Sequence, residues 1–291
     1  MAGRLDVRKT YKLYLGGAFP RSESGRTYEV VDTRGRFLAN AALASRKDAR
    51  DAVVAARKAC DGWSAATAYN RGQVLYRVAE LMEGRRDQFV DEVLAAEGGG
   101  RARAATAVDA AIDRWVWYAG WTDKIGQVAG SSNPVAGPYF NFSTPEPTGV
   151  VAALAPQTSS LLGLVSVLAP ILCAGNTVVA VTSAERPLPA VTLSEVLATS
   201  DVPGGVVNVL TGRAAELGPW LADHLDVNAI DLTGAAGDTE LAADLEVRAA
   251  ENTKRVLRAP ATEPDWSAVP DGPHRILSFC ETKTVWHPVG V

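Results

Sequence analysis

Runs of β-branched and other apolar residues recur through the second half of the chain, and apolar residues at helical spacing lie between them. These runs are Gly149–Leu154, Thr177–Val181, Val206–Leu210, Ala229–Leu232 and Thr253–Leu257. Short apolar runs next to turn residues are typical of strands that are buried on both faces of a parallel sheet. Because a segment long enough for a helix separates each pair of runs, the pattern predicts an α/β fold with a doubly wound, five-stranded parallel sheet.

The turn at Gly175 and Asn176 lies at the centre of this pattern. The apolar stretch Leu161–Ala174 before it has the length of a helix, and glycine commonly follows the last turn of a helix. Ligands of doubly wound sheets bind beyond the carboxyl ends of the strands. We therefore expect any ligand crevice to lie in the loops that follow Leu154, Val181, Leu210 and Leu232.

The first half of the chain has the pattern of amphipathic helices. Ser45 and Asp48 form a capping box, and the helix that they begin carries Cys60 on its apolar face. Further helices are predicted at Asn70–Met82, Arg86–Glu97 and Ala104–Ile125, and short strands at Tyr11–Leu15 and near Thr27–Val31. We expect the helices to form a layer against the sheet, with the Trp and Tyr rings of the last helix packed in the core.

Residues 126–148 differ from the segments on either side because they are rich in Gly, Ser, Asn and Pro, which favour turns. Within them, apolar and polar residues alternate at Tyr139–Ser143, as in a strand with one exposed face. We expect this segment to project from the body as a hairpin or arm.

The overall composition is that of a globular protein with a sizeable core, since 47% of the 291 residues are hydrophobic and 21% are charged. The formal net charge is −4 and Lys and Arg are scattered, so we expect neither nucleic acid nor an anionic membrane as a partner. Leu161–Ala174 contains Pro170 and is shorter than the ~20 apolar residues of a membrane-spanning helix. Met1–Val7 has no apolar signal-peptide region, so we expect a cytoplasmic location.

The cysteines and histidines do not form a recognisable site. Cys60, Cys173 and Cys280 are odd in number and far apart, which fits a reducing compartment rather than a disulfide framework. None of them lies at metal-ligand spacing, and we expect no metal. The histidines are equally isolated and are expected to be surface or packing residues; they are His224, His274 and His287.

Four motifs, in this order, resemble landmarks of the aldehyde dehydrogenase superfamily: Gly149–Pro156, Ala174–Val179, Pro203–Gly212 and Leu232–Gly234. The resemblance implies a Rossmann-like cofactor domain over residues 1–125 and 149–260, which includes an amino-terminal helical layer. It also implies a small β oligomerisation arm over residues 126–148 and 274–291, because Arg275–Trp286 is similar to the family's closing strand. Residues 261–273 would then be a linker that replaces the family's catalytic domain.

The resemblance also implies where catalytic residues should lie. The family uses a cysteine nucleophile, a carboxylate base, and an asparagine that helps to stabilise the oxyanion. Thr158 stands at the position of the asparagine and Ala259 at that of the base, while Glu263 is expected to be a solvated carboxylate in the linker. We expect Cys173 and Cys280 to be inert packing thiols because of their apolar surroundings. The chain should therefore be inactive on its own.

Cofactor binding by the family's mode is expected to be lost. The resemblance places Val181 where the family has a lysine for the adenine ribose. In the loop after the fourth strand, Thr239 replaces a second glycine, and Asp238 adds a negative charge near the phosphate position. We expect no cofactor, with NAD or NADP left open through a vestigial loop formed by Gly234, Ala235 and Gly237.

Three functions remain open. The favoured one is a non-catalytic structural or regulatory subunit that docks its arm on a full-length, active aldehyde dehydrogenase, because unpaired strand edges are association sites. In the family, the arm extends the sheet of a neighbour's catalytic domain, which a second copy of this chain would not offer. The alternatives are an NAD(P)-binding oxidoreductase with an atypical site, and a homo-oligomer that binds a small metabolite in the crevice.

Overall fold

The computed structural model describes residues 9–290, so Met1–Val7, which led to the expected location, and Val291 lie outside the described residues. The body contains a five-stranded, wholly parallel sheet in the order β7-β6-β5-β8-β9. Its strands are β5 (Val150–Leu154), β6 (Thr177–Val181), β7 (Val207–Leu210), β8 (Ala229–Asp231) and β9 (Arg255–Leu257). The predicted α/β fold is confirmed. Strand β9 begins later than predicted because Thr253 has a φ of 56°, which belongs to a turn.

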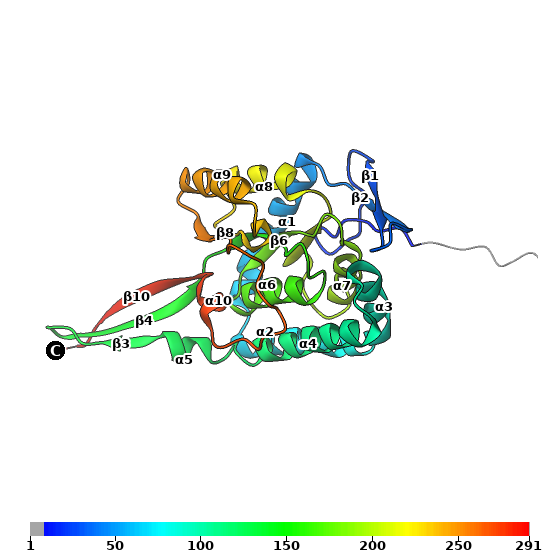
Figure 1. The fold of residues 1–291 in the computed structure, drawn as a ribbon. Coiled ribbons are helices and arrows are strands. Elements are labelled where there is room, and N and C mark those ends of the chain that lie inside the picture. The colour runs from blue at the N-terminus through cyan, green and yellow to red at the C-terminus, as the bar shows by residue number, and fades with distance from the viewer. Residues whose placement is uncertain (1–8, 291) are drawn as a thin grey trace, which may run out of the picture.

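Helices cover both faces of the sheet (Figure 1). Successive residues of β5 point to opposite faces, so Val151 and Ala153 join one apolar core while Val150, Ala152 and Leu154 join the other. The connecting helices are α6 (Leu162–Cys173), α7 (Leu188–Leu197), α8 (Ala214–Asp223) and α9 (Thr239–Ala250), with the short 3₁₀ helix η1 (Thr233–Ala235) before α9. Among residues 9–290, no helix is long and apolar enough to cross a membrane.

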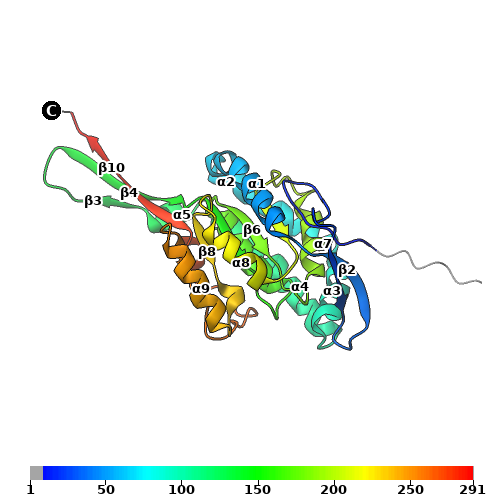
Figure 2. The ribbon, with the colours of Figure 1, turned by 90° about the horizontal axis from the view of Figure 1, so that it is seen from above.

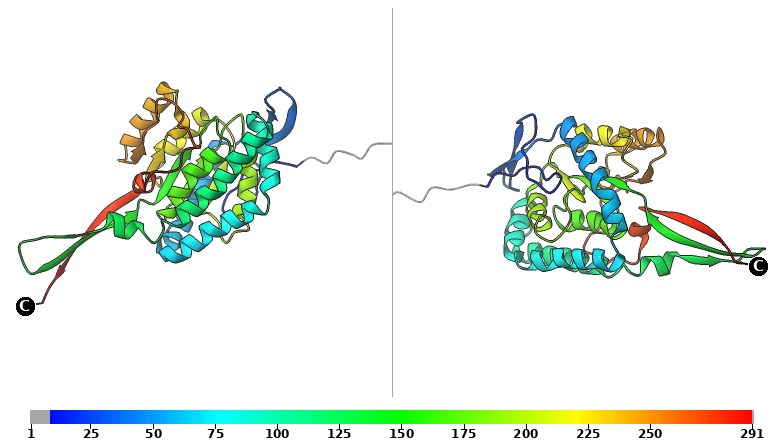
Figure 3. Two further views of the ribbon diagram at one scale, coloured as in Figure 1. Left: turned by 60° about the horizontal axis from the view of Figure 1, so that its bottom comes forward. Right: turned by 180° about the vertical axis from the view of Figure 1, so that it is seen from behind.

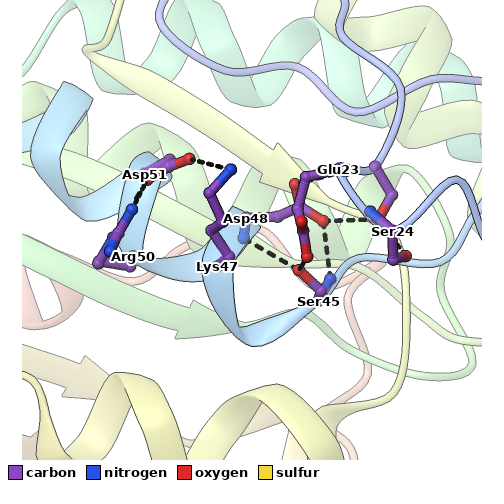
Figure 4. A network of polar contacts seen from close by, with 8 residues as sticks. Glu23, Ser24, Ser45, Lys47, Asp48, Arg50 and Asp51 are labelled. Carbon is purple, nitrogen blue, oxygen red and sulfur yellow. Dashed lines mark hydrogen bonds and ion pairs between the residues drawn. The ribbon is translucent and has the colours of Figure 1, made fainter.

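The amino-terminal helices are α1 (Arg46–Ala65), α2 (Ala68–Glu83), α3 (Arg86–Glu97), α4 (Arg101–Ala119) and α5 (Ile125–Ala129). The capping box is present at the start of α1: Asp48 N donates to Ser45 Oγ at 3.3 Å, and Ser45 N donates to the Asp48 carboxylate at 2.8 Å (Figure 4). The predicted helix over Ala104–Ile125 is two helices, because the chain turns at Gly120, which caps α4.

The amino-terminal meander contains the hairpin β1 (Thr27–Val31) and β2 (Phe37–Ala42). The predicted strand Tyr11–Leu15 is wrong. Its residues form only isolated bridges, because Tyr11 pairs with Ala41 of β2, whereas Tyr14 pairs with Val209 of β7. A segment that changes partner in this way crosses between two sheets and extends neither of them.

A second, antiparallel sheet in the order β10-β4-β3 extends away from the body (Figures 1, 2 and 3). Its strands are β3 (Ser131–Asn133), β4 (Tyr139–Pro147) and β10 (Cys280–Pro288). We call this sheet the arm. Pairing of β4 and β10 runs from Cys280 opposite Pro147 to Pro288 opposite Tyr139. The first part of the segment expected as a closing strand is instead the short helix α10 (His274–Leu277), in which Ile276 is buried.

Candidate functional site at the carboxyl edge of the parallel sheet

The loop after β5 presents a row of hydrogen-bond donors at the edge where a ligand was expected. The backbone amides of Gln157, Thr158 and Ser159 donate to the carboxylate of Glu263 at 3.0, 2.9 and 3.1 Å. The Thr158 hydroxyl donates to the same carboxylate at 2.6 Å, and the indole N–H of Trp266 does so at 3.1 Å. Consecutive amides that converge in this way form an anion-binding nest, and here the anion belongs to the linker.

Glu263 is therefore not the solvated carboxylate that the sequence suggested. Its neighbours Pro264 and Asp265 are exposed, as the polar composition predicts, but its own side chain turns back onto the β5 loop. The Thr158 hydroxyl, which stands where the resemblance places an asparagine, is used to bind this carboxylate. An external oxyanion or phosphate would have to displace Glu263 to reach these donors.

The position at which the resemblance implies a lysine of the family is Val181, which carries no charge. The side chain of Val181 is fully buried in the core and cannot contact a ligand at the sheet edge. The loop after β6 is tied to its neighbour, because Ser183 Oγ donates to the Gln157 carbonyl at 3.0 Å and Ala184 N donates to Gln157 Oε1 at 3.2 Å. The β5 and β6 loops thus close against one another.

The loop after β8 contains Gly234, Ala235 and Gly237, through which binding of NAD or NADP was left open. Gly234 and Ala235 are buried beneath the end of β5, whereas Gly237 is exposed, with a φ of 79°. A Cβ atom on Gly234 would lie 2.2 Å from the carbonyl oxygen of Ala155, so close packing against β5 is enough to require glycine there. The amino end of α9 is capped by its own residue, since Leu241 N donates to the Asp238 carboxylate at 3.0 Å. The expectation of no cofactor, with NAD or NADP left open through this loop, stays a prediction.

None of the cysteines lies in a setting that would activate a thiolate. Burial raises the pKa of Cys173 to about 12 and that of Cys280 to about 11, and it also raises the pKa of Cys60. Cys280 lies at the start of β10, where its Sγ contacts the Ile276 carbonyl oxygen at 3.4 Å. Thiols with raised pKa values are poor nucleophiles at neutral pH. In the part of the chain that the structure describes, no group of three or more His, Cys, Asp or Glu side chains could hold a metal ion.

Two buried polar contacts of the linker and α10 were not predicted from the sequence. Arg114, on α4, donates to Ser166 Oγ at 2.6 Å and to the carbonyl oxygens of Trp266 and Ala268 at 2.9 Å each. Arg275, in α10, forms an ion pair at 2.6 Å with the fully buried Asp231 at the end of β8. The sequence feature that could have indicated such a contact is an arginine on the apolar face of a helix, because a buried charge needs partners.

A cavity of about 670 Å³ lies between α4 and the linker, beside the β5 loop. Leu162 and Trp266 supply apolar surface. The charged lining residues are of both signs: Arg103, Arg186, Glu97 and Asp265. The cavity is of the size that small ligands use. It lies at the predicted edge of the sheet, and the linker forms one of its walls.

Comparison with known sequences gives one consistent result. The sequence profile described as "Aldehyde dehydrogenase family" matches residues 19–259. Cytosolic 10-formyltetrahydrofolate dehydrogenase of Pongo abelii is 35% identical over 79% of this chain and 26% of its own length. Retinal dehydrogenase 2 of Homo sapiens is 33% identical over 87% of this chain and 48% of its own. The chain therefore spans half, or less, of the length of these relatives.

Comparison with solved structures agrees. Aldehyde dehydrogenase from Bacillus cereus, solved as an NAD+ complex, superposes with a TM-score of 0.80 at 27% identity. PnpE from Pseudomonas sp. WBC-3 superposes with a TM-score of 0.79 at 29% identity. Each match covers 85% of this chain and 50% of the other.

Proposed function

Since this chain belongs to the aldehyde dehydrogenase family, we propose that it is a non-catalytic structural or regulatory subunit, which docks its arm on a full-length, active aldehyde dehydrogenase. The observation that carries this proposal is the arm. Its outer strand β10 has β4 on one side only, and most of its residues are exposed. Unpaired strand edges associate with other chains unless they are protected.

Aromatic residues on the arm support a protein partner. Tyr139, Phe140 and Trp286 are 45%, 51% and 58% exposed, and the rings of Tyr139 and Trp286 pack against each other with centroids 5.7 Å apart. Trp286 lies on the edge strand β10 and the other two rings on the central strand β4, and exposed, rigid aromatic side chains are typical anchors of protein interfaces. Intramolecular packing leaves much of their surface open, so a partner would bury apolar area there.

The state of the crevice supports a non-catalytic role. Residues 261–273 contain no helix or strand, and they occupy the place where the proposal puts the missing catalytic domain. The carboxylate of Glu263 takes up the donors of the β5 loop, and the cysteines are buried with raised pKa values. Oxidation of an aldehyde by the family's route needs a thiolate and a free oxyanion site, and neither is offered.

Co-expression with candidate partners tests the proposal. Each full-length aldehyde dehydrogenase encoded in the same genome is co-expressed with this chain, and complexes are identified by native mass spectrometry. We expect a stable hetero-oligomer with one of them, and no NAD-dependent aldehyde oxidation by this chain alone. The partner's kcat and KM, measured with and without this chain, then separate a regulatory role from a purely structural one.

A matched pair of variants locates the contact. The double variant Tyr139→Ser and Trp286→Ser should weaken the complex at least tenfold, because it removes the exposed rings of the arm. The control is Tyr69→Ser on α2, which removes a tyrosine that is 69% exposed on the body. Recovery of this chain only as a free monomer, or equal weakening by both variants, contradicts the proposal. Binding of NAD or NADP at millimolar concentration would instead favour an oxidoreductase with an atypical site.

The cavity beside the linker favours a second candidate, a homo-oligomer that binds a small anionic metabolite there. Arg103, whose guanidinium has no hydrogen bond or ion pair within the described residues, would hold the anion against Trp266. Light scattering would give a homo-oligomer in the absence of any aldehyde dehydrogenase. A ligand-induced rise in the melting temperature that Arg103→Gln abolishes would favour this candidate over the first.

A further inference from the structure

The amino-terminal meander gathers basic residues that the sequence shows as scattered. Lys9, Lys12, Arg21 and Arg26 all line one cavity of about 420 Å³ that lies against β2. Among the lining residues within 9–290, none is Asp or Glu. We call this cavity the basic groove. The hairpin of β1 and β2 lies at the opposite end of the molecule from the arm (Figures 1 and 2), so the groove is distinct from the proposed docking surface.

Three of the four cations are available for a ligand. Lys9 is already bound, because its Nζ lies 2.8 Å from the Glu195 carboxylate and 3.0 Å from Thr192 Oγ1. By contrast, Lys12 and Arg21 have no side-chain hydrogen bond or ion pair within residues 9–290. Arg26 makes only a weak contact, from Nε to Ser24 Oγ at 3.4 Å.

Two carboxylates that contact lining residues of the groove also bind other groups. Asp48 accepts from the Ser22 hydroxyl at 2.7 Å. It also accepts from the Glu23 amide at 3.1 Å (Figure 4). Glu195 lies between Lys9 and Arg85, at 2.8 and 2.6 Å. Neither carboxylate lines the cavity, so its field is set by the unpaired cations.

Backbone hydrogen bonds hold the segments that carry these cations. The carbonyl of Tyr11, next to Lys12, accepts from Ala42 N at 3.0 Å, and the carbonyl of Arg26 accepts from Leu43 N at 2.9 Å. Leu13 N donates to the Pro20 carbonyl at 3.1 Å, which joins the residue after Lys12 to the residue before Arg21. The backbone that carries the positive groups is therefore fixed before any ligand arrives, which lowers the entropic cost of binding.

We propose that the basic groove binds a small phosphorylated metabolite, whose phosphate contacts Lys12, Arg21 and Arg26. Guanidinium groups match phosphate oxygens in a bidentate geometry, and a lysine adds a point charge. The aromatic and small residues Phe37 and Ala39 of β2 line the same cavity and would contact the organic part of the ligand. The enclosed volume favours a small molecule over an extended polyanion, because cavities of roughly 300–1,000 Å³ are typical of small-ligand sites.

Calorimetric titration at low and at physiological salt tests the proposal, with pyrophosphate, a pentose phosphate and a nucleoside monophosphate as separate probes and sulfate as a reference anion. We expect at least one phosphorylated probe to bind at least tenfold more tightly than sulfate, with an affinity that falls as salt rises. Which probe binds separates an inorganic from an organic phosphate ligand. Equal affinity for sulfate and every probe, or no binding at 10 mM, overturns the proposal.

A charge-matched pair of double variants locates the site. Lys12→Gln with Arg21→Gln should weaken binding at least tenfold, since two contacts to the phosphate are lost. The control is Arg34→Gln with Lys58→Gln, which removes two exposed cations outside the groove. If the first double variant fails to fold, Arg21→Gln alone is used, because Arg21 is exposed and its side chain has no hydrogen bond or ion pair with another described residue. Equal weakening by the control overturns the proposal, because net charge would then explain the binding.

Discussion

Replacing Glu263 with alanine should release the linker from the carboxyl edge of the sheet. The wild-type carboxylate accepts hydrogen bonds from the amides of residues 157–159, from the Thr158 hydroxyl and from the indole of Trp266. Alanine leaves all of these donors without their acceptor at once. Water would reach some of them, because the site is partly open to solvent.

The size of the effect follows from the number of contacts and their exposure. A hydrogen bond to a charged group contributes about 1.5–3 kcal/mol when buried, and less where water replaces it. The contacts share one carboxylate, so their energies do not add. We expect Glu263→Ala to lower the free energy of unfolding by about 2–4 kcal/mol, a large part of the 5–15 kcal/mol of a typical domain. Glu263→Gln keeps an acceptor oxygen and should lose about half as much.

Urea unfolding followed by tryptophan fluorescence measures this loss, and hydrogen exchange measures protection of the amides at residues 157–159. Asp271→Ala is the matched control, because it removes an exposed carboxylate from the same linker. Phosphate or sulfate should raise the melting temperature of Glu263→Ala more than that of the wild type, since the vacated nest accepts an anion. The reasoning is refuted if Glu263→Ala matches Asp271→Ala in stability and its 157–159 amides stay as protected as in the wild type.

Three further predictions concern stability. Arg114→Met should lower the free energy of unfolding by about 2–4 kcal/mol, because two linker carbonyls lose a buried donor. The control Arg103→Met replaces an exposed residue of the same helix and should change the free energy of unfolding by under about 0.5 kcal/mol. Urea titration compares the two variants, and similar values would contradict the role of Arg114 in holding the linker. Gly234→Ala should lower the free energy of unfolding by at least about 2 kcal/mol, because its Cβ meets a carbonyl oxygen at the end of β5. Gly237→Ala should lower it by about 1 kcal/mol because of the positive φ alone. A calorimetric melt in which Gly237→Ala is the more destabilised variant would contradict this order. Burial lowers the pKa of Lys254 from 10.5 to about 8. Between these pH values the unfolded chain binds more protons than the folded chain, so the free energy of unfolding should rise with pH across that window. Lys254→Met should lack this rise, and the same pH profile in the variant and the wild type would show that Lys254 does not cause it.

The strands of the parallel sheet could be predicted from the sequence because burial on both faces leaves a local signature. Thr177–Val181 has the same bounds in sequence and in structure, since a run of β-branched residues after Gly175 and Asn176 admits few other conformations. Tyr11–Leu15 has a similar local pattern, yet it is no strand, because its partners lie in two different sheets. The β-strand propensity of a segment depends on its own residues, whereas the pairing of a strand depends on residues that are distant in sequence.

The candidate site was predicted less completely for the same reason. Glu263 is in a polar, proline-rich segment that reads as solvated, and only the folded loop at residues 157–159 shows that its charge is bound. Likewise, Lys12 and Arg26 are isolated in sequence but share the basic groove once the meander folds. That Val181 and Ala259 stand where the family has functional side chains follows from the resemblance and stays a prediction; the structure shows that Val181 is fully buried.

The arm is assembled from strands at two distant places in the chain, with the entire parallel sheet encoded between them. During synthesis, β4 leaves the ribosome well before β10 exists, so its long edge stays without its main partner until the body has been made. Pairing of strands that are distant in sequence is slow, and it leaves an aggregation-prone intermediate with an exposed strand edge. The nascent chain should therefore depend on chaperones, or on a partner supplied early, to reach its final form.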